Sequence, residues 1–378
     1  MRILITGVST RAIAESARAS GYDFITLDYF GDYDQKSWCQ NYSLKRDFEL
    51  PFSSAALYAA SQSLAFEAVA YTSNLENHPE VVARFEAEHR LLGNRAADLS
   101  KVRHWPTLFR FLAQEEIGVP ETIYANDYRC PDPARRWLKK PIRSGGGHGI
   151  VWWAGDVAPG KGFLVQEYIP GLDCSASFIA NGQECVVIGL TEQLIGRPEF
   201  GVGGFRYCGN ILPPAISPGE RAMLLAQVRH LAGSLTREFR LVGANGVDFV
   251  LKDGQIYLME VNPRYCASME LMERAYGLSV FDLHVRSITA GELLDFDLAP
   301  RLASGPFYGK AILYAEKDAV APDTRGWPER GVRDVPFSGE SLTRGSPVCT
   351  VLAQGPTRDA CYASLVAQAE ALKGEIYA

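Results

Sequence analysis

Residues 242–264 read VGANGVDFVLKDGQIYLMEVNPR. Two apolar runs flank the turn sequence KDG, a pattern that predicts a β-hairpin. Asp248 lies in the first run, whereas Glu260 and Asn262 lie in the second. Because Glu260 and Asn262 are two residues apart, their side chains share one face of the strand. Carboxylate and amide oxygens aimed in one direction are typical ligands of a hard cation.

Asp248 reaches the same face only if the turn contributes an odd number of unpaired residues. A three-residue loop with a glycine bulge would do so, whereas a two-residue turn would point Asp248 away. Two acids and an amide among apolar strand residues are costly to bury unless a cation satisfies them. The sequence therefore predicts that Asp248, Glu260 and Asn262 hold a metal, and polar residues at a sheet edge are the alternative.

Upstream of the hairpin, a glycine-rich segment lies between two predicted strands. Its lysines end the strand RWLKKPI, and the loop RSGGGHG leads into the strand IVWWA. Free backbone amides in such a loop can approach phosphate oxygens, and the neighbouring lysine adds charge. The loop lacks the GxxxxGK[ST] pattern of a P-loop. A phosphate lid is one interpretation, and a flexible hairpin turn is the other.

The segment LVQEYIPGLD, residues 164–173, runs from a strand into a Pro-Gly turn with an acid beyond it. Extended backbone can hydrogen-bond the edge of a base, and a carboxylate can accept from ribose hydroxyls. A nucleotide-binding hinge and an ordinary surface turn are both compatible with this segment.

Composition limits the classes of function. The chain has 378 residues, 47% hydrophobic and 22% charged, with a net charge of −6. This charge gives no reason to expect a nucleic-acid or membrane partner. The eight cysteines form no CxxC pair, which argues against a zinc site or a disulfide framework and favours the reducing cytoplasm. MRILITG at the start resembles a buried strand and has no signal-peptide features.

The pattern along the chain predicts an α/β and α+β protein built from three units. RILITG, RAIAESARAS and FITLDY form a strand–helix–strand opening, AFEAVAY is a further strand, and HPEVVARFEAEHRLLG is a helix that ends at Gly93. A second helix runs from Lys101 to Glu116. Gly7 starts no GxGxxG fingerprint, so a dinucleotide site is not expected there. The predicted units are residues 1–95, an α/β unit; 96–298, the nucleotide-binding and catalytic region; and 299–378, a strand-rich unit closed by a helix.

Taken in this order and spacing, KKP–RSGGGHG, VQEYIPG–D, GVDF and MEVNPR resemble the ATP-grasp superfamily. The resemblance implies an ATP-grasp fold with a Rossmann-like N-terminal unit and a small C-terminal unit. It implies that ATP is bound by Lys140, Ser144, Gly145, Gly146, Gly147, His148, Gln166, Glu167, Ile169 and Asp173. Gln166 and Ile169 would meet adenine through backbone groups, and Asp173 would bind ribose. Asp248, Glu260 and Asn262 would hold two Mg²⁺ ions, which Mn²⁺ could replace.

The resemblance also implies the catalytic cations, which are Lys140, Arg264 and Arg143. Family members often carry a lysine early in the helix that precedes GVPET, but Trp105 or Pro106 stands near that position here. Lys101 or Arg103 could replace it, and Arg143 could supply the missing charge. The loop IGRPEFGVGGFRYCGN offers Arg197, Arg206 and Tyr207 as substrate contacts, although its glycines also suit a mobile linker.

The function implied is that of a cytoplasmic ligase. It would activate a carboxylate, such as that of glutamate, as an acyl phosphate and couple it to an amine. The substrates would be small molecules, and the sequence leaves open whether the chain forms a homo-oligomer. A narrower similarity links the chain to ligases of methanofuran and tetrahydromethanopterin one-carbon cofactor pathways. The alternatives are activation of bicarbonate or formate, as in biotin-carboxylase-like or purine-type enzymes, and a nucleotide-binding regulatory protein without turnover.

Overall fold

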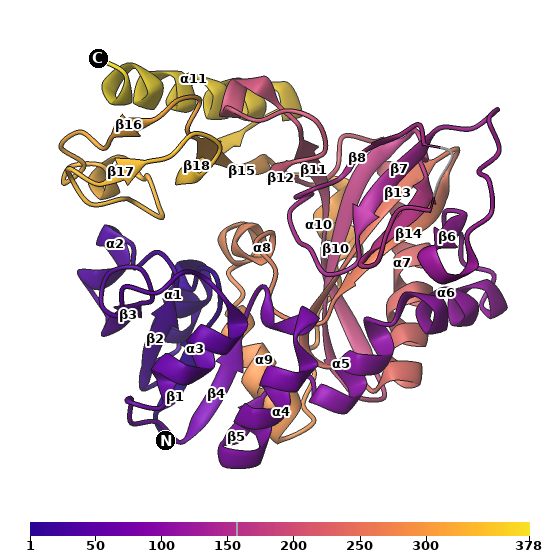
Figure 1. The fold of residues 1–378 in the computed structure, drawn as a ribbon, viewed down its shortest axis with the longest axis horizontal. Coiled ribbons are helices and arrows are strands. Elements are labelled where there is room, and N and C mark those ends of the chain that lie inside the picture. Colours follow the sequence, from indigo (N-terminus) through magenta and orange to yellow (C-terminus); the bar gives the residue numbers. More distant parts are fainter. Residues whose placement is uncertain (156–157) are drawn as a thin grey trace.

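The N-terminal unit is a parallel sheet of order β3-β2-β1-β4-β5, seen at the lower left of Figure 1. The computed structural model describes residues 1–155 and 158–378. The strands are β1 Ile3–Thr6, β2 Phe24–Asp28, β3 Asn41–Ser43, β4 Ala68–Tyr71 and β5 Arg90–Leu92. The helices are α1 Arg11–Ala19, α2 Tyr33–Lys36, α3 Ser54–Ser61, α4 Pro79–Glu88 and the 3-10 helix η1 Leu75–Asn77. The predicted strand–helix–strand opening is confirmed.

The helix predicted to run to Gly93 is wrong in its last third. Helix α4 ends at Glu88, His89 is extended, and Arg90–Leu92 forms β5. The segment pairs in parallel with β4, which places Ala70 beside Leu92. Leu92 is thereby buried at the sheet edge, so a tertiary contact overrides the helical pattern of the sequence.

The helix predicted from Lys101 to Glu116 is two helices, α5 Ala96–Val102 and α6 Trp105–Gln114. A proline in the first turn of α6 fits a helix start, where its missing N–H leaves no bond unmade. The break leaves Arg103 at the corner between the two helices. From there its side chain reaches Glu260, one of the predicted metal ligands.

The centre of the molecule is a seven-stranded antiparallel sheet of order β14-β13-β10-β11-β12-β15-β18. Its strands are β10 Leu172–Asn181, β11 Cys185–Ile195, β12 Tyr207–Leu212, β13 Val242–Lys252, β14 Gln255–Asn262, β15 Phe307–Tyr314 and β18 Pro347–Gly355. Helix α7, Pro218–Phe239, packs on one face together with α6. Helices α8 Met269–Tyr276 and α9 Val280–Thr289 fill the space between this sheet and α1.

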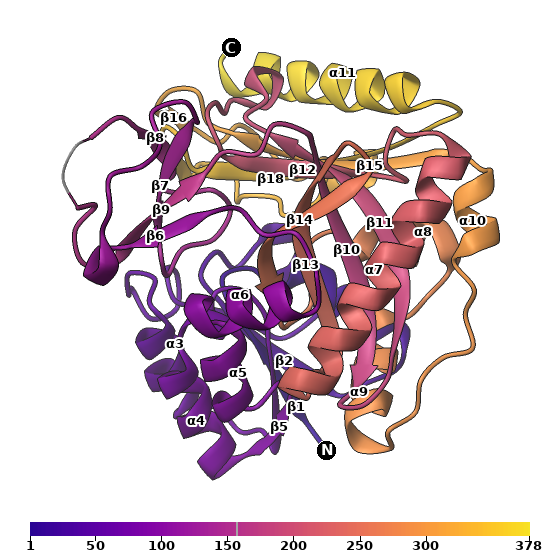
Figure 2. The ribbon, with the colours of Figure 1, turned by 90° about the vertical axis from the view of Figure 1, so that its right-hand side faces the viewer.

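A second, four-stranded antiparallel sheet of order β6-β9-β7-β8 lies beside the central sheet in Figure 2. Its strands are β6 Thr122–Tyr124, β7 Trp137–Pro141, β8 Val151–Trp153 and β9 Phe163–Glu167, with η2 Ala125–Asp127 after β6. The glycine loop connects β7 to β8. Side chains of both sheets line one cavity, so the functional candidates of β7 and β9 face those of β13 and β14.

The C-terminal strands β15 Phe307–Tyr314 and β18 Pro347–Gly355 continue the central sheet, whereas β16 Ala319–Val320 and β17 Ser341–Leu342 form a small two-stranded sheet of their own. β15 pairs with β12, and helix α11, Arg358–Ile376, covers β15 and β18. The remaining elements are η3 Pro198–Phe200, α10 Ala299–Ala303 and η4 Pro328–Arg330. The mixed fold class is confirmed, whereas the unit boundaries at residues 95 and 298 stay predictions. Within residues 1–155 and 158–378, no helix combines the length and apolar character that crossing a bilayer requires.

Candidate functional site

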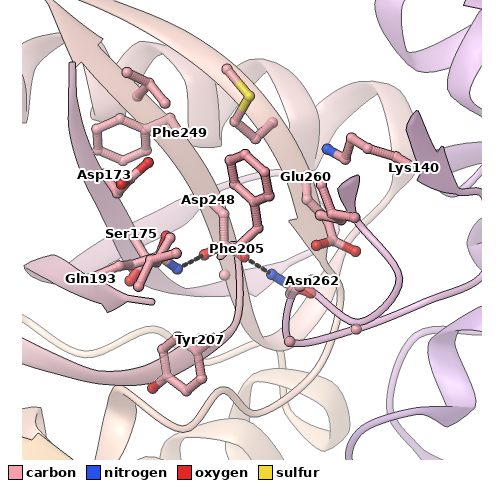
Figure 3. A pocket seen from close by; sticks show the side chains of 18 of the residues that line it. Lys140, Asp173, Ser175, Gln193, Phe205, Tyr207, Asp248, Phe249, Glu260 and Asn262 are labelled. Carbon is pink, nitrogen blue, oxygen red and sulfur yellow. Dashed lines mark hydrogen bonds between the residues drawn. The ribbon is translucent and has the colours of Figure 1, made fainter. Parts of the chain in front are cut away.

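A cavity of about 400 Å³ lies between the four-stranded sheet and the central sheet (Figure 3). Lys140 and Gln166 line it from the four-stranded sheet, and Asp248, Glu260 and Asn262 line it from the central sheet. This volume is within the range of small-molecule sites. The cavity therefore gathers residues that the sequence analysis had selected from four separate motifs.

Asp248 lies directly opposite Glu260 in the β13–β14 ladder, and both side chains face the cavity. The turn between the strands has only two residues, Asp253 and Gly254, which is the case in which Asp248 was expected to point away. The odd residue is instead Met259, which is unpaired between Leu258 and Glu260. This bulge in the strand produces the offset that brings Asp248 to the face of Glu260.

Asp248 is held by two amide groups. Gln193 Nε2 donates to its Oδ1 at 2.9 Å, and Asn262 Nδ2 donates to its Oδ2 at 2.8 Å, as the dashed lines in Figure 3 show. Burial, followed by repulsion from Glu260, raises the pKa of Asp248 to about 7. Two facing carboxylates in a buried place are the donor set that a divalent cation stabilises, because its charge offsets both burial and repulsion.

Glu260 is paired with Arg103, whose Nη1 lies 2.8 Å from Oε1 of the carboxylate. Lys101, the other candidate for the missing cation, is exposed on α5. In the described part of the chain, no three His, Cys, Asp or Glu side chains gather as in an all-protein metal centre. Two carboxylates and an amide fit Mg²⁺ instead, which keeps water and phosphate oxygens as further ligands.

Lys140 is half-buried in the cavity that the carboxylates also line. Its Nζ donates to Oε1 of Gln166 at 2.8 Å, and Nε2 of Gln166 donates to Thr122 at 3.1 Å. Burial lowers the pKa of Lys140, although Glu260 and Asp248 act in the opposite direction. The ammonium group therefore lies in a poorly hydrated place, where an anion gains more from it than at the surface.

The backbone of Gln166 lies inside the sheet, between β6 and β7. The expected backbone contact from Gln166 to adenine does not fit this arrangement. Ile169, by contrast, follows the end of β9 and lines the cavity, and within the described chain its amide donates to no protein group. Glu167 and Asp173 also line the cavity, and burial raises the pKa of Asp173. Ile169 and Asp173 thus have the placement that a nucleotide hinge needs.

The glycine loop covers the cavity and touches the loop before β12. Gly145, Gly146 and Gly147 line the cavity, and Gly146 O accepts a bond from Tyr207 N at 3.1 Å. A Cβ on Gly147 would lie 1.8 Å from the carbonyl oxygen of Phe205, and its φ of +74° also favours glycine.

Two further residues of this loop face away from the cavity. Ser144 Oγ donates to the carbonyl of His148 at 2.8 Å and thereby closes the loop on itself. Burial and the nearby Arg206 lower the pKa of His148. Neither residue lines the cavity.

Arg264 lies at the cavity end nearest the N-terminal unit. Its Nη2 donates to Oδ1 of Asn262 at 3.1 Å, and its Nε donates to Oε1 of Glu76 at 3.0 Å. Burial opposes the charged form, but Glu76 outweighs it and raises the pKa of Arg264 above its usual value. The guanidinium thus stays charged beside the residues proposed to bind metal.

Three other predicted cations lie elsewhere. Arg143 is exposed and faces Glu80 at 3.6 Å, so it does not supply charge to the cavity. Arg197 is exposed, and Arg206 donates to the carbonyl of Gly345 at 3.3 Å, toward the C-terminal unit. None of the three lines the cavity. These corrections share a cause: glycine-rich loops allow many directions, and periodicity does not fix where their side chains point.

Tyr207 does line the cavity, and burial raises its pKa well above the usual value. Several neutral residues that also line the cavity were not predicted from the sequence, and these are Ser175, Gln193, Asn210, Cys266 and Ser268. The alternation of side chains in β10 and β11 could have indicated Ser175 and Gln193. Strand β10 pairs with β13 of the hairpin, and β11 pairs with β10. Nothing in the sequence pattern alone indicates Cys266 or Ser268.

The chain is similar to several known proteins. Residues 105–268 match the family described as ATP-grasp domain. An uncharacterized protein of Methanocaldococcus jannaschii is 22% identical over 370 residues, which is 94% of this chain and 88% of that protein. The carbamoyl phosphate synthase large chain of Halobacterium salinarum is 24% identical over 196 residues, which is 51% of this chain but only 16% of that protein. The L-amino acid ligase of Bacillus licheniformis superposes with a TM-score of 0.68 at 14% identity, covering 100% of this chain and 98% of that structure.

Proposed function

This chain carries an ATP-grasp domain, and from that premise we propose that it is an ATP- and Mg²⁺-dependent ligase that joins a carboxylate to an amine. The carboxylate would be activated as an acyl phosphate with release of ADP, and the amine would then displace phosphate. One observation carries the proposal: Asp248, Glu260 and Asn262 share a face of β13 and β14 and line the same cavity as the half-buried Lys140.

The nucleotide would be held at the four-stranded sheet. The free amide of Ile169 would donate to the adenine edge, and Asp173 would accept from the ribose hydroxyls. Lys140, held in place by Gln166 at 2.8 Å, would contact the phosphates beneath Gly145–Gly147. Each of these contacts uses a group that already lines the cavity.

Asp248, Glu260 and Asn262 would hold the Mg²⁺ ions. When bound, Mg²⁺ neutralises phosphate oxygens so that an anionic carboxylate can approach them. The buried amides of Gln193 and Asn262 orient Asp248 for this role at 2.9 and 2.8 Å.

Arg264 would stabilise the negative charge that develops when the acid attacks the γ-phosphoryl group and when the amine attacks the acyl phosphate. The glycine loop, seated on Phe205 and Tyr207, would exclude water, which otherwise hydrolyses an acyl phosphate. No cysteine or serine nucleophile is part of this scheme, and burial raises the pKa of the nearby Cys266 to about 12, which disfavours its thiolate.

The finer proposal is that the acid is an amino acid such as glutamate. A cavity of about 400 Å³ suits a nucleotide with a small acid, and its neutral polar end at Ser175, Asn210 and Ser268 suits an amino acid's polar groups. An acid–amine pair of one-carbon cofactor assembly is one pair of this class.

The test is ADP release by the purified chain across a panel of amino acids and amines. We expect release that needs an acid, an amine and Mg²⁺ together. Glu260→Gln should lower turnover at least about 100-fold because a charged ligand is lost. The matched control is Asp253→Asn, in the turn of the same hairpin, which should retain full turnover. ADP release without any amine would favour activation of bicarbonate or formate, and full turnover by Glu260→Gln would reject the proposed site.

A further inference from the structure

We propose that Glu76 and Asn77 of the N-terminal unit are positioning residues, each of which limits how far one arginine turns onto the carboxylates of the metal-binding set. The inference rests on the proposed function for its catalytic readout only. Both residues belong to η1, which follows the parallel strand β4, and both are buried. Neither lines the cavity, so each would act through another side chain.

Glu76 holds Arg264. Nε of Arg264 donates to Oε1 of Glu76 at 3.0 Å, and Nη2 of the same guanidinium donates to Oδ1 of Asn262 at 3.1 Å. Asn262 in turn donates to Asp248 at 2.8 Å. A continuous chain of contacts therefore leads from η1 to the first carboxylate.

Asn77 holds Arg103 in a parallel way. Oδ1 of Asn77 accepts from Nε of Arg103 at 3.1 Å and from its Nη2 at 2.5 Å. Nη1 of Arg103 reaches Oε1 of Glu260 at 2.8 Å and the carbonyl of Val261 at 2.7 Å. The guanidinium is thus divided between the amide of η1 and the second carboxylate.

The two arginines could compete with Mg²⁺ for the two carboxylates. Arg103 and Arg264 are two cations beside Asp248 and Glu260, which Mg²⁺ must also bind. A guanidinium that turned fully onto a carboxylate would form a bidentate pair and compete with the metal. Glu76 and Asn77 each supply an alternative acceptor, so Arg264 bonds to Glu76 and Asn262, and the guanidinium of Arg103 is shared between Asn77 and Glu260.

Asn77 also contacts the glycine loop, and Glu76 keeps one oxygen unpaired. Nδ2 of Asn77 donates to the carbonyl of Ser144 at 3.5 Å, at the start of the loop. Oε2 of Glu76 is buried and, within the described chain, has no hydrogen-bond partner. The second oxygen of Glu76 is therefore free to attract Arg264 further, and no other described donor competes for it.

The experiment measures ADP binding by calorimetry over a series of Mg²⁺ concentrations, beside the Mg²⁺ dependence of ADP release. In Glu76→Ala and Asn77→Ala the freed arginine should turn onto its carboxylate. The Mg²⁺ concentration for half-maximal binding should rise about 10- to 100-fold, as for other residues that orient metal ligands. At saturating Mg²⁺, the affinity for the nucleotide should be unchanged. Glu80→Ala, an exposed acid on α4, is the matched control and should leave both quantities unchanged.

Conservative variants separate positioning from mere structural support. Asn77→Asp adds a charge beside Arg103 and should draw it from Glu260, so the Mg²⁺ requirement should stay equal to or fall below that of the parent chain. Glu76→Gln keeps an acceptor for Arg264 and should lie between the parent and Glu76→Ala.

An unchanged Mg²⁺ requirement in both alanine variants would overturn the inference. So would equal increases in Asn77→Asp and Asn77→Ala, because a structural role predicts loss in both. If the alanine variants do not fold, Asn77→Asp and Glu76→Gln still decide. A parent chain that binds ADP with Mg²⁺ but releases none with any acid and amine would reject the proposed function alone, since the binding series is independent of turnover.

Discussion

Lys140 Nζ donates to the side-chain oxygen of Gln166 at 2.8 Å, across the neighbouring strands β7 and β9. Lys139, the preceding residue, points to the other face, where its ammonium lies 4.4 Å from the ring of Phe163. Two adjacent lysines of one strand therefore have different environments. Lys140 lines the cavity, whereas Lys139 does not line it and packs on an aromatic side chain.

This alternation predicts unequal effects of the same substitution. Lys140→Met removes the half-buried cation and should lower turnover about 100-fold, since a fixed charge at the phosphates contributes several kcal/mol in a poorly hydrated site. Lys139→Met should change turnover less than about twofold, as an exposed cation–π contact contributes under about 1 kcal/mol. Steady-state assays of ADP release compare the two. Similar losses in both variants would contradict the placement of Lys140.

The contact of the glycine loop with Phe205 predicts that Gly147→Ala impairs closure. The added Cβ would lie 1.8 Å from the Phe205 carbonyl, and the φ of +74° costs an alanine about 1 kcal/mol. We expect a tenfold or greater loss of turnover, on the order of that for a misplaced lid. Gly203→Ala, in the opposing loop, meets nothing within 4 Å and serves as the control. Full activity in Gly147→Ala would show that this contact is dispensable.

Removal of the metal should separate binding from folding. A ligand at 100 times its dissociation constant stabilises the native state by about 3 kcal/mol. Mg²⁺ with ADP should therefore raise the melting temperature, and a chelator should reverse the increase without unfolding the chain. In Glu260→Gln the increase should be largely absent. The result to compare is a thermal melt with ADP alone, with Mg²⁺ alone and with both.

His284 predicts a separate dependence of stability on pH. Its Nδ1 accepts from the amide of Ala244 at 2.8 Å, and Nε2 lies 3.1 Å from the carbonyl of Leu92, so the ring is held neutral. Burial lowers the pKa of His284 to about 4. In the unfolded chain the pKa is about 6.5, so the unfolded state takes up the proton first as the pH falls.

Stability should consequently be unaffected by this group above pH 6.5 and should fall between pH 6.5 and 4, by about 3 kcal/mol in total. Urea titrations over that range measure the slope. In His284→Gln the slope should become smaller, whatever the stability at neutral pH. His230→Gln, on the exposed side of α7, should retain the slope of the parent chain.

The sequence was sufficient to predict the residues whose position follows from strand alternation. Glu260 and Asn262 share a face because they are two residues apart, and the structure agrees. The bulge at Met259, which brings Asp248 to the same face, was not predictable from the sequence. A bulge depends on how the two strands pack against neighbouring elements in the folded chain. The same limit explains why the helix toward Gly93 ended early: the partner strand β4 is near only in the folded chain.

The cations around the cavity were the least predictable part. Arg103 contacts Glu260 because the break between α5 and α6 directs its side chain toward β14. Arg143 lies outside the cavity because its side chain faces Glu80 of α4. Glu76 and Asn77 stood in a polar segment that the sequence analysis assigned to no function. Their partners, Arg264 and Arg103, follow them by 188 and 26 residues. Such long separations carry no local signal.

The pairing of β12 with β15 makes residues 307–378 an integral part of the architecture. In a shortened chain that ends before Phe307, β12 would become an edge strand with unpaired backbone groups exposed to solvent. Unprotected edges of this kind recruit other chains and lead to aggregation. The nucleotide-binding region expressed by itself should therefore aggregate, even though every residue proposed to bind ATP precedes the truncation site.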